Sequence, residues 1–481
     1  MRLVAGADSS TQSCTVVLRN ADDGRLVATA EAPHPPTRPP VSEQHPEAWW
    51  SGLVAACRQL SMHDVDAISV DAQGHGLVAL DGDDEVIRPA KLWNDTTSSP
   101  EAEELVARLG REAWANRTGI VPVPAITITK LLWLKRHEPE NFARIATILL
   151  PSDYLTYRLT GNFVTDRTEA SGTGYFDAAS STWDLDLLAL VDNRVDWSPR
   201  LPRIAGPNQC VGRVTAGAAE ATGIPEGALV GPGANDQPVN ALALGLREED
   251  VLISLGTSGT VCARSLVPTA DPTATVTGVA DATGAYLPLA CTLNATKVTD
   301  TFARLLGVDL DGLADLALTA LPEADRPVLI PYLDGERTPS RPRATGVLIG
   351  LRPGATREQL ARAAFEGVLC GLAEGLDAIR GLGVPTDGRV VLTGGGSNSR
   401  AYRQFLADLI GRPIYVSDMA ETSASGAAVQ AAAVLHGRPV DDVARAWAPP
   451  LRVAAEPRLD QHVSEVRERY RRYAAMEGLD S

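Results

Sequence analysis

The sequence predicts an α/β protein whose two related domains face one another across a cleft, and three observations support this prediction. The chain has 481 residues, which is too long for a single hydrophobic core. Strand and helix patterns alternate along its first half, as in a sheet that is covered by helices. A hairpin with a hydroxyl-rich tip occurs twice, about half a chain apart, and this repetition indicates two related halves.

The first half opens with short segments that are typical of strands, followed by helix patterns. The strand segments lie near Val4, Val16, Val27 and Ile68, and the helix patterns start at Pro46 and Glu101. The proline-rich stretch 33–40 is expected to be a loop, because the alternation resumes directly after it.

The second half is expected to begin at a charged segment, residues 247–250. This places an N-terminal domain at 1–247 and a C-terminal domain at 248–481. Alanine and glycine spaced for close packing predict a long helix over 360–379. Residues 389–411 are typical of a strand, a glycine loop and an amphipathic helix.

Composition limits the class of protein. The formal net charge is −16 and no run of Lys and Arg occurs, which argues against a nucleic-acid surface. We expect no membrane span and no signal peptide, because no segment is long and apolar enough and the N-terminus enters a strand directly. The six cysteines are scattered, so reduced thiols in a cytoplasmic protein are expected.

The two hairpin tips are candidates for phosphate binding, although a single such tip is also an ordinary turn. Backbone N–H groups and hydroxyls at Ser10 and Thr11, and at Gly256-Thr257-Ser258, can converge on anionic oxygens. The first hairpin also carries Asp8. A carboxylate beside a phosphate is repulsive unless a cation lies between them, so Asp8 points to Mg²⁺.

A third candidate is the glycine loop Gly394-Gly395-Gly396-Ser397-Asn398. Three glycines let a ligand approach the backbone, and the next helix offers free N–H groups. A tight turn would need only one glycine, so ligand contact is favoured. The chain contains neither a Walker A motif nor a complete GxGxxG motif.

Two further loops carry polar side chains. In "LVGPGANDQPVNALALGL", Asp236 and Gln237 lie at a helix start, where chemistry and simple helix capping are evenly balanced. In "VDAQGHGLVAL", Gln73 and His75 follow a strand; a lone His is commonly structural, yet an amide beside an imidazole suits hydroxyl recognition. The basic residues of 129–142 are expected to form a solvated helix face.

These pieces, in this order, resemble the FGGY family of carbohydrate kinases of the actin/hexokinase superfamily, and within it the xylulokinase subgroup. The resemblance covers nearly the whole chain and includes "TKLLWLKRHEP", "LPSDYLTYRLTG", "SLGTSGT", "PYLDGERTP", "GVLIGLRPGATREQLARAAFEG" and "LTGGGSNS". It implies two ribonuclease H-like domains flanking a catalytic cleft. It also implies ATP- and Mg²⁺-dependent phosphorylation of D-xylulose to D-xylulose 5-phosphate. There are two alternatives: the substrate is another ketose or polyol, or the chain is a non-catalytic sensing protein of the same fold. The resemblance leaves open whether the protein forms a homodimer.

The resemblance assigns roles to individual residues. Asp236 corresponds to the catalytic base, and Asp8 to the aspartate that positions Mg-ATP with water between. The sugar-side residues are Gln73, Gly74, His75, Asp236 and Gln237. The ATP-side residues are Ser10, Thr11, Gly256, Thr257, Ser258, Gly395, Gly396 and Asn398.

Three departures from the family pattern concern these loops. Ser10 stands where the family has glycine, Gly74 where xylulokinases commonly have Met, and Ala-Asn-Asp-Gln (234–237) where Gly-Gly-Asp-Asn is more frequent. Gly74 is expected to leave room in the sugar pocket and to loosen selection by size.

Overall fold

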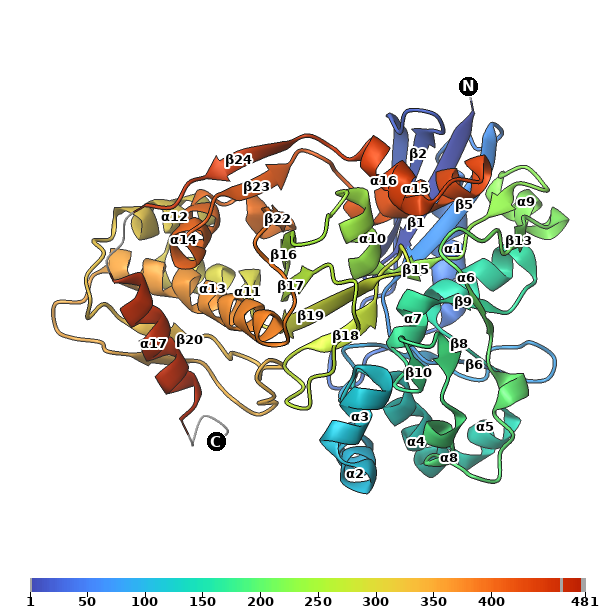
Figure 1. Cartoon of the computed structure of the whole chain (residues 1–481), viewed down its shortest axis with the longest axis horizontal. Coiled ribbons are helices and arrows are strands. Elements are labelled where there is room, and N and C mark those ends of the chain that lie inside the picture. Colours follow the sequence, from blue (N-terminus) through green and yellow to red (C-terminus); the bar gives the residue numbers. More distant parts are fainter. Residues whose placement is uncertain (1, 459–461, 477–481) are drawn as a thin grey trace.

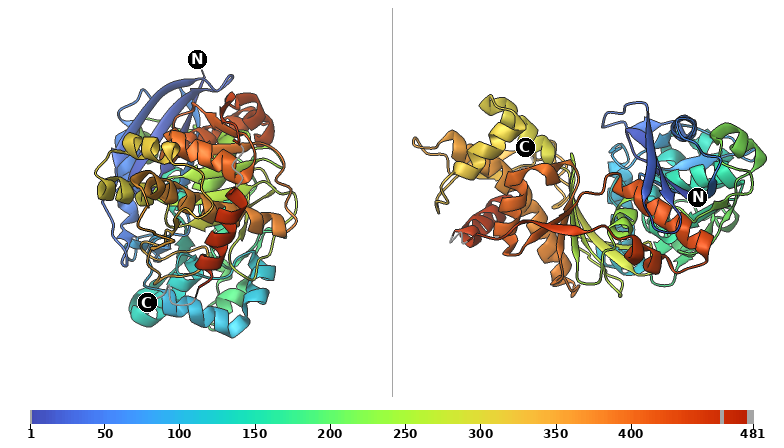
Figure 2. Two further views of the ribbon diagram at one scale, coloured as in Figure 1. Left: turned by 90° about the vertical axis from the view of Figure 1, so that its left-hand side faces the viewer. Right: turned by 90° about the horizontal axis from the view of Figure 1, so that it is seen from above.

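The computed structural model describes residues 2–458 and 462–476 and consists of two lobes, each built on a seven-stranded sheet (Figure 1). Seen from above, the lobes lie side by side and are joined at the middle (Figure 2). The first sheet contains β1 (Leu3–Ser9), β2 (Ser13–Asn20), β3 (Leu26–Pro33), β5 (Val65–Ala72), β13 (Gly212–Arg213), β14 (Leu229–Val230) and β15 (Ala234–Asn235). The second contains β16 (Val251–Leu255), β17 (Gly259–Ala263), β18 (Thr277–Ala280), β19 (Tyr286–Thr292), β22 (Val390–Thr393), β23 (Ile414–Ser417) and β24 (Leu451–Ala455).

The two sheets share one topology. In the first, β3, β2 and β1 are antiparallel neighbours, and β5 and then β14 continue the sheet in parallel. In the second, β19, β17 and β16 are antiparallel neighbours, followed by the parallel strands β22 and β23. The predicted fold class, two ribonuclease H-like domains, is therefore confirmed.

The central strand β1 is buried on both faces because helices cover both sides of the first sheet. Leu3, Ala5 and Ala7 pack in the cluster that includes α1 (Pro46–Cys57), whereas Val4 packs with the alanines of α15 (Thr422–His436). A Cβ at Gly6 would lie 1.9 Å from the carbonyl oxygen of Ala424, so α15 lies directly against the strand. Alternating side chains thus serve two different helices.

Helices α15 and α16 (Val440–Trp447) follow the second sheet in sequence but pack on the first lobe, where they appear in red beside the blue strands (Figure 1). The domain boundary at 247/248 stays a prediction, and 422–447 is a segment of the second half that belongs spatially to the first lobe.

The second lobe is organised around α13 (Arg357–Gly381), which contains the predicted helix 360–379. A capping box between Thr356 and Gln359 begins this helix, and its buried face packs with β17 and β19. The other helices of this lobe are α11 (Thr296–Leu306), α12 (Leu310–Thr319), α14 (Arg400–Ile410) and α17 (Val463–Ala474), with the 3₁₀ turn η2 (Gly395–Asn398).

The first lobe carries further helices and small two-stranded sheets. Its helices are α2 (Ser99–Leu109), α3 (Arg111–Thr118), α4 (Thr127–His137), α5 (Pro139–Arg144), α6 (Pro151–Thr160), α7 (Arg167–Ser171), α8 (Leu185–Ala189), α9 (Ala216–Thr222) and α10 (Asp236–Ala243), with the 3₁₀ turn η1 (Ser198–Arg200). The paired short strands are β4 (Glu43–Gln44) with β7 (Ala90–Lys91), β6 (Val78–Leu80) with β8 (Thr147–Leu149), β9 (Val164–Asp166) with β12 (Arg203–Ala205), β10 (Phe176–Asp177) with β11 (Thr182–Trp183), and, in the second lobe, β20 (Val328–Ile330) with β21 (Val347–Ile349).

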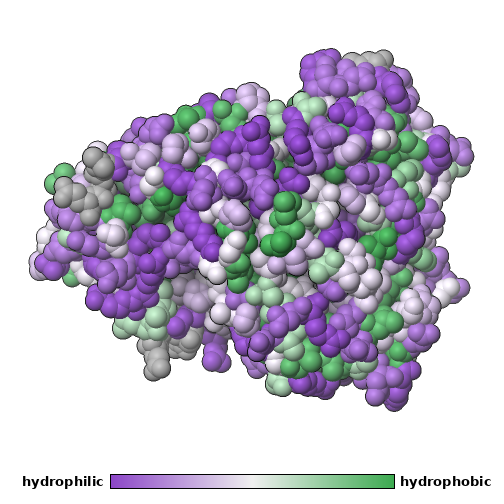
Figure 3. Space-filling model, in the orientation of Figure 1, coloured by the Kyte–Doolittle hydropathy of each residue, from purple (hydrophilic) through white to green (hydrophobic). Residues whose placement is uncertain are grey.

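Hydrophilic residues dominate the face shown in Figure 3, and hydrophobic ones form small separate groups. Within residues 2–458 and 462–476, no helix has the length and apolar character needed to cross a membrane. All six cysteines are free thiols, and five of them are buried, Cys210 being exposed.

Candidate active site

A cavity of about 190 Å³ lies between the lobes and gathers all five predicted sugar-side residues. Its first-lobe wall is formed by the loop after β5 and the hairpin between β1 and β2. Its second-lobe wall comes from β17, β19 and the loop after β20. The predicted residues that line it are Ser10, Thr11, Gln73, Gly74, His75, Asp236, Gln237 and Ser258.

The remaining predicted ATP-side residues lie outside this cavity, around the tip of β16. The glycine loop is next to that tip because β22 pairs with β16. A Cβ at Gly394 would lie 2.5 Å from the carbonyl oxygen of Leu255, and one at Gly396 would lie 2.7 Å from the Leu255 Cβ. Packing therefore explains two of the three glycines, whereas Gly395 faces open space.

The ends of the second hairpin tip are fixed from the other side. The N–H groups of Ala295 and Thr296 donate to the carbonyl oxygens of Thr257 and Gly256. Thr257 and Asn398 are exposed, so their polar groups are available to a ligand. These residues form a second polar surface, apart from the sugar-side cavity.

Asp236 begins α10 and faces the cavity. Its carboxylate accepts from the Gln237 N–H at 2.7 Å and from the Gln237 Nε2 at 3.3 Å. Burial raises its pKa above the ordinary value. Asn235 occupies the N-cap position, so capping is not the task of Asp236.

Gln237 links the two walls of the cavity. Its Oε1 accepts a hydrogen bond from the Thr260 hydroxyl of β17 at 3.0 Å. Asp236 directly precedes Gln237 in the chain, so it lies next to a hydrogen bond that joins the two lobes. A change in lobe orientation would act directly on the position of the Asp236 carboxylate.

The first hairpin reaches the sugar side through Thr11. The Thr11 hydroxyl donates to Gln73 Oε1 at 2.9 Å and accepts from Trp93 Nε1 at 3.0 Å. The Gln73 Nε2 donates in turn to Gln44 Oε1 at 3.2 Å. The Thr11 side chain is thus committed to the sugar-side wall, and its assignment to ATP stays a prediction. Ser10 closes the turn, donating to the Ser13 carbonyl at 3.0 Å.

His75 presents a hydrogen-bond acceptor to the cavity. Its Nδ1 lies 3.1 Å from the carbonyl oxygen of Gly172, and because a carbonyl only accepts, Nδ1 carries the proton. Burial, with the nearby charges of Arg337 and Lys130, lowers the pKa of His75 to about 3. The ring is therefore neutral, and its Nε2 is left as an acceptor. The residue has a φ of 67°, an uncommon conformation for a side chain of this size.

Lys130 is a functional candidate that the sequence analysis missed. Its Nζ donates to the carbonyl oxygens of His75 and Ala125, both at 2.6 Å. The expectation that the basic residues of 129–142 form a solvated face is wrong for Lys130, which is fully buried. Burial also lowers its pKa to about 7. Its position within the apolar row of α4 was the only sequence signal.

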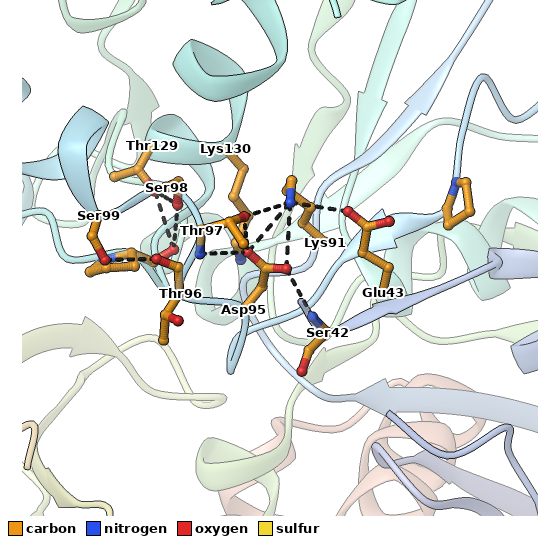
Figure 4. Close-up of polar contacts among 12 residues, drawn as sticks. Ser42, Glu43, Lys91, Asp95, Thr96, Thr97, Ser98, Ser99, Thr129 and Lys130 are labelled. Carbon is orange, nitrogen blue, oxygen red and sulfur yellow. Dashed lines mark hydrogen bonds and ion pairs between the residues drawn. The ribbon is translucent and has the colours of Figure 1, made fainter. Parts of the chain in front are cut away.

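Lys130 lies beside a second buried lysine. Figure 4 shows Lys91 between Glu43 and Asp95, with Lys130 alongside. The Lys91 Nζ lies 3.0 Å from Glu43 Oε1 and 3.4 Å from Asp95 Oδ1. Asp95 also raises the pKa of Lys130, against the larger effect of burial. This network supports the sugar-facing turn from within the first lobe.

Gly74 does not leave room in the pocket, contrary to expectation. A Cβ at this position would lie 1.9 Å from the side-chain Nδ2 of Asn235. The space that a larger residue would occupy is filled from the neighbouring loop. The sequence offers no local signal for this contact, because 161 residues separate the two positions.

Arg337 was also missed and brings a cation to the second-lobe wall. The preceding residue, Glu336, is buried and accepts from the Leu293 N–H at 2.5 Å and from Asn294 Nδ2 at 2.8 Å. These bonds hold the loop against the end of β19. Arg337 therefore lines the cavity from a loop that these hydrogen bonds hold in place.

Asp8 lies on β1 directly opposite Asp71 of the parallel neighbour β5. Burial raises the pKa of Asp8 to about 7 and that of Asp71 well above its ordinary value. The Asp8 carboxyl raises the pKa of Asp71 further, whereas the side-chain hydrogen bond with Asp71 lowers the pKa of Asp8. Asp8 Oδ1 has no hydrogen-bond partner among the described residues.

That orphaned oxygen fits a cation bound mainly by other ligands. No set of three or more His, Cys, Asp or Glu side chains able to hold a metal ion occurs in the described part of the chain. Mg²⁺ keeps most of its waters and usually takes one or two carboxylates together with substrate phosphates. Asp8 therefore suits Mg²⁺ that arrives with a nucleotide, rather than a resident metal cage.

Comparisons with known proteins agree with this arrangement. The model of the FGGY family of carbohydrate kinases, N-terminal domain, matches residues 3–243, and that of the C-terminal domain matches residues 251–435. The chain belongs to the FGGY family of carbohydrate kinases. It is thus a kinase that uses ATP to phosphorylate a sugar, and the resemblance seen in the sequence is confirmed.

Several relatives carry a more specific name. A xylulose kinase of Streptomyces coelicolor is 42% identical, over 95% of this chain and 92% of the relative. A xylulose kinase of Escherichia coli is 35% identical, over 85% of each chain. Among solved structures, xylulose kinase from Bifidobacterium adolescentis has a TM-score of 0.86 and 38% identity, over 97% of this chain and 99% of the other.

Proposed function

We propose that this kinase transfers a phosphoryl group from Mg-ATP to O5 of D-xylulose, with Asp236 as the general base. The observation that carries the proposal is the convergence of Gln73, His75 and Asp236 on one cavity between the lobes. The 42% identity to a protein named xylulose kinase supports D-xylulose as the sugar.

The sugar-side residues divide the work. Asp236 accepts the proton of the attacking hydroxyl as its oxygen bonds to phosphorus. Its raised pKa makes the carboxylate a stronger base, and general-base help of this kind is worth about 10²–10⁴ in rate. The Nε2 of His75 accepts from a second hydroxyl, and the Gln73 amide is fixed by Thr11 and Gln44 for a third.

The ATP side is assigned to the two hairpin tips and the glycine loop. Ser10 and Thr11 would face the phosphates through the backbone of their turn, because their hydroxyls already donate to the Ser13 carbonyl and to Gln73. The loop Gly256-Thr257-Ser258, with its two hydroxyls, would bind phosphates from the second lobe. Gly395, Gly396 and Asn398 would contact the adenosine end. Asp8 would hold Mg²⁺ with water between them, and Mg²⁺, when bound, neutralises triphosphate charge. The six free thiols support a reducing, cytoplasmic setting.

A substrate panel tests the proposal. Purified protein with Mg-ATP is assayed for ADP release with D-xylulose, D-ribulose, L-ribulose, D-fructose, xylitol and glycerol, and ³¹P NMR locates the phosphate. D-Xylulose should give the highest kcat/KM and a 5-phosphate product. A higher value with another ketose or polyol would replace D-xylulose as the substrate. Sugar binding without any ATP turnover would instead indicate a non-catalytic sensing protein.

A further inference from the structure

The side chain of Asn235 forms part of the sugar-cavity wall, immediately before Asp236. Its amide occupies the position above Gly74, where any Cβ would approach Nδ2 to 1.9 Å. That distance is far below van der Waals contact. Gly74 and Asn235 are therefore complementary in shape: the amide can keep this position only while residue 74 has no side chain, and a Cβ there would displace it.

Two hydrogen bonds orient Asn235. Its main-chain N–H donates to the Thr168 hydroxyl at 2.8 Å, and its Oδ1 accepts from the Gln237 N–H at 3.4 Å. The second bond caps α10 and identifies which amide atom faces the helix. The other atom, Nδ2, has no acceptor among the described residues. A hydrogen-bond donor is thus left at the cavity wall.

We propose that Asn235 is a sugar-binding residue that determines specificity, its Nδ2 donating to the sugar oxygen adjacent to the hydroxyl held by Asp236. The ligand class is a ketose or polyol with a vicinal pair of hydroxyls at its reacting end. Asn235 and Asp236 line the same cavity from consecutive positions of the chain, which places both residues at the reacting end of a bound sugar. This inference rests on the proposed sugar-kinase function and extends it to a residue that the sequence analysis left unassigned.

A capping role alone would make different demands. Serine also caps a helix N-terminus, so Asn235→Ser keeps the cap and removes the amide donor. If Asn235 only caps α10, this variant should bind sugar normally. If Nδ2 bonds a hydroxyl, analogues that lack that hydroxyl should no longer be rejected, because no buried partner is left unpaired.

The test uses Asn235→Ser, Gly74→Ala, Asn235→Gly and the double variant Gly74→Ala/Asn235→Gly. Each is assayed with D-xylulose and its 4-deoxy analogue, and sugar binding is measured by calorimetry without ATP. Asn235→Ser should lower kcat/KM for D-xylulose about 10- to 100-fold, leave KM for ATP unchanged, and reduce the preference for D-xylulose over the analogue to near unity. Asp309→Ser, at the N-cap of α12 outside the cavity, is the matched control and should leave sugar kinetics unchanged.

The double variant tests the shape complementarity. Gly74→Ala alone should impair sugar binding by displacing the amide, but should cost much less once Asn235 is glycine. The inference would be overturned if the effects of Gly74→Ala and Asn235→Gly on sugar binding simply multiplied in the double variant. It would also be overturned if Asn235→Ser kept the wild-type preference for D-xylulose over the 4-deoxy analogue. Either result would leave the proposed kinase activity intact. Sugar binding by the wild type without phosphorylation would instead overturn the proposed function alone. A wild type that binds no sugar of the panel would overturn both.

Discussion

The Nζ of Lys130 lies 2.6 Å from the carbonyl oxygen of His75, so a buried amine of α4 holds the backbone of the sugar-facing turn. The imidazole of the same residue is fixed separately, by the carbonyl of Gly172. Main chain and side chain of His75 are thereby anchored to two different elements, and only Nε2 remains for a ligand. Lys130 acts on the sugar through His75 and is a positioning residue.

Lys130→Met should raise KM for the sugar, because the turn loses a bond from a partly charged donor. Such bonds contribute about 1.5–3 kcal/mol, so kcat/KM for D-xylulose should fall about 10- to 100-fold. KM for ATP should change little. Lys135→Met, which removes a lysine of the same helix that bonds the Val191 carbonyl, is the control. Equal sugar kinetics in both variants would show that Lys130 has no positioning role.

Lys130 should also make the stability of the protein depend on pH. Its pKa is about 7 in the folded chain, below the ordinary value of about 10.4. Between these values the unfolded chain binds more protons, so the contribution of Lys130 to the free energy of unfolding rises with pH from about 7 to 10. Urea unfolding of wild type and Lys130→Met at pH 7, 8 and 9 measures this. The stability of the variant relative to wild type should be greatest at pH 7; a constant difference would contradict the prediction.

His75→Ala should lower kcat/KM for the sugar about 10²-fold or more, with little change in KM for ATP. Because burial holds the pKa of His75 at about 3, the imidazole stays neutral and keeps its acceptor at pH 5–8. The sugar affinity of the wild type, measured by calorimetry, should therefore show no pH dependence that arises from His75 over this range. A pH-dependent step that is present in the wild type and lost in His75→Ala would contradict this. Intact sugar kinetics in a folded His75→Ala protein would make the histidine structural.

Asp236→Asn should lower kcat by about 10² or more while the protein stays folded, since the amide cannot take the proton. Helix α10 should persist because its cap is Asn235. Circular dichroism and sugar calorimetry check the fold and the binding site. A kcat near that of the wild type would remove Asp236 from the mechanism.

Asp8→Ala should weaken the use of Mg-ATP while sugar binding without nucleotide persists. The reason is that Asp8, the proposed Mg²⁺ residue, has a buried oxygen with no hydrogen-bond partner among the described residues and is not part of the wall of the sugar cavity. Titration of Mg²⁺ at fixed ATP gives the apparent metal requirement, and calorimetry gives sugar affinity. Unchanged Mg²⁺ and ATP dependence would leave Asp8 with a structural role only.

The sequence predicted those features that depend only on residues close together in the chain. The two hairpins, the strand–glycine loop–helix segment and the helix over 360–379 were all found, because turn residues and periodicity act over a few positions. Burial of Lys130 and the contact between Gly74 and Asn235 were not predictable, since each depends on where a distant loop packs. The same applies to Asp71, whose only signal, an acidic residue within an apolar strand, gains meaning when β1 and β5 pair.

The position of α15 limits how the lobes can move. The chain leaves the first lobe after α10, returns between β23 and α15, and leaves again between α16 and β24 (Figure 1). Three covalent connections therefore join the two lobes, in addition to noncovalent contacts such as the hydrogen bond between Gln237 and Thr260. Sliding of one lobe past the other would therefore have to be accommodated by all three connections at once. Each lobe is thus discontinuous in sequence, and neither can be produced from one continuous piece of the gene.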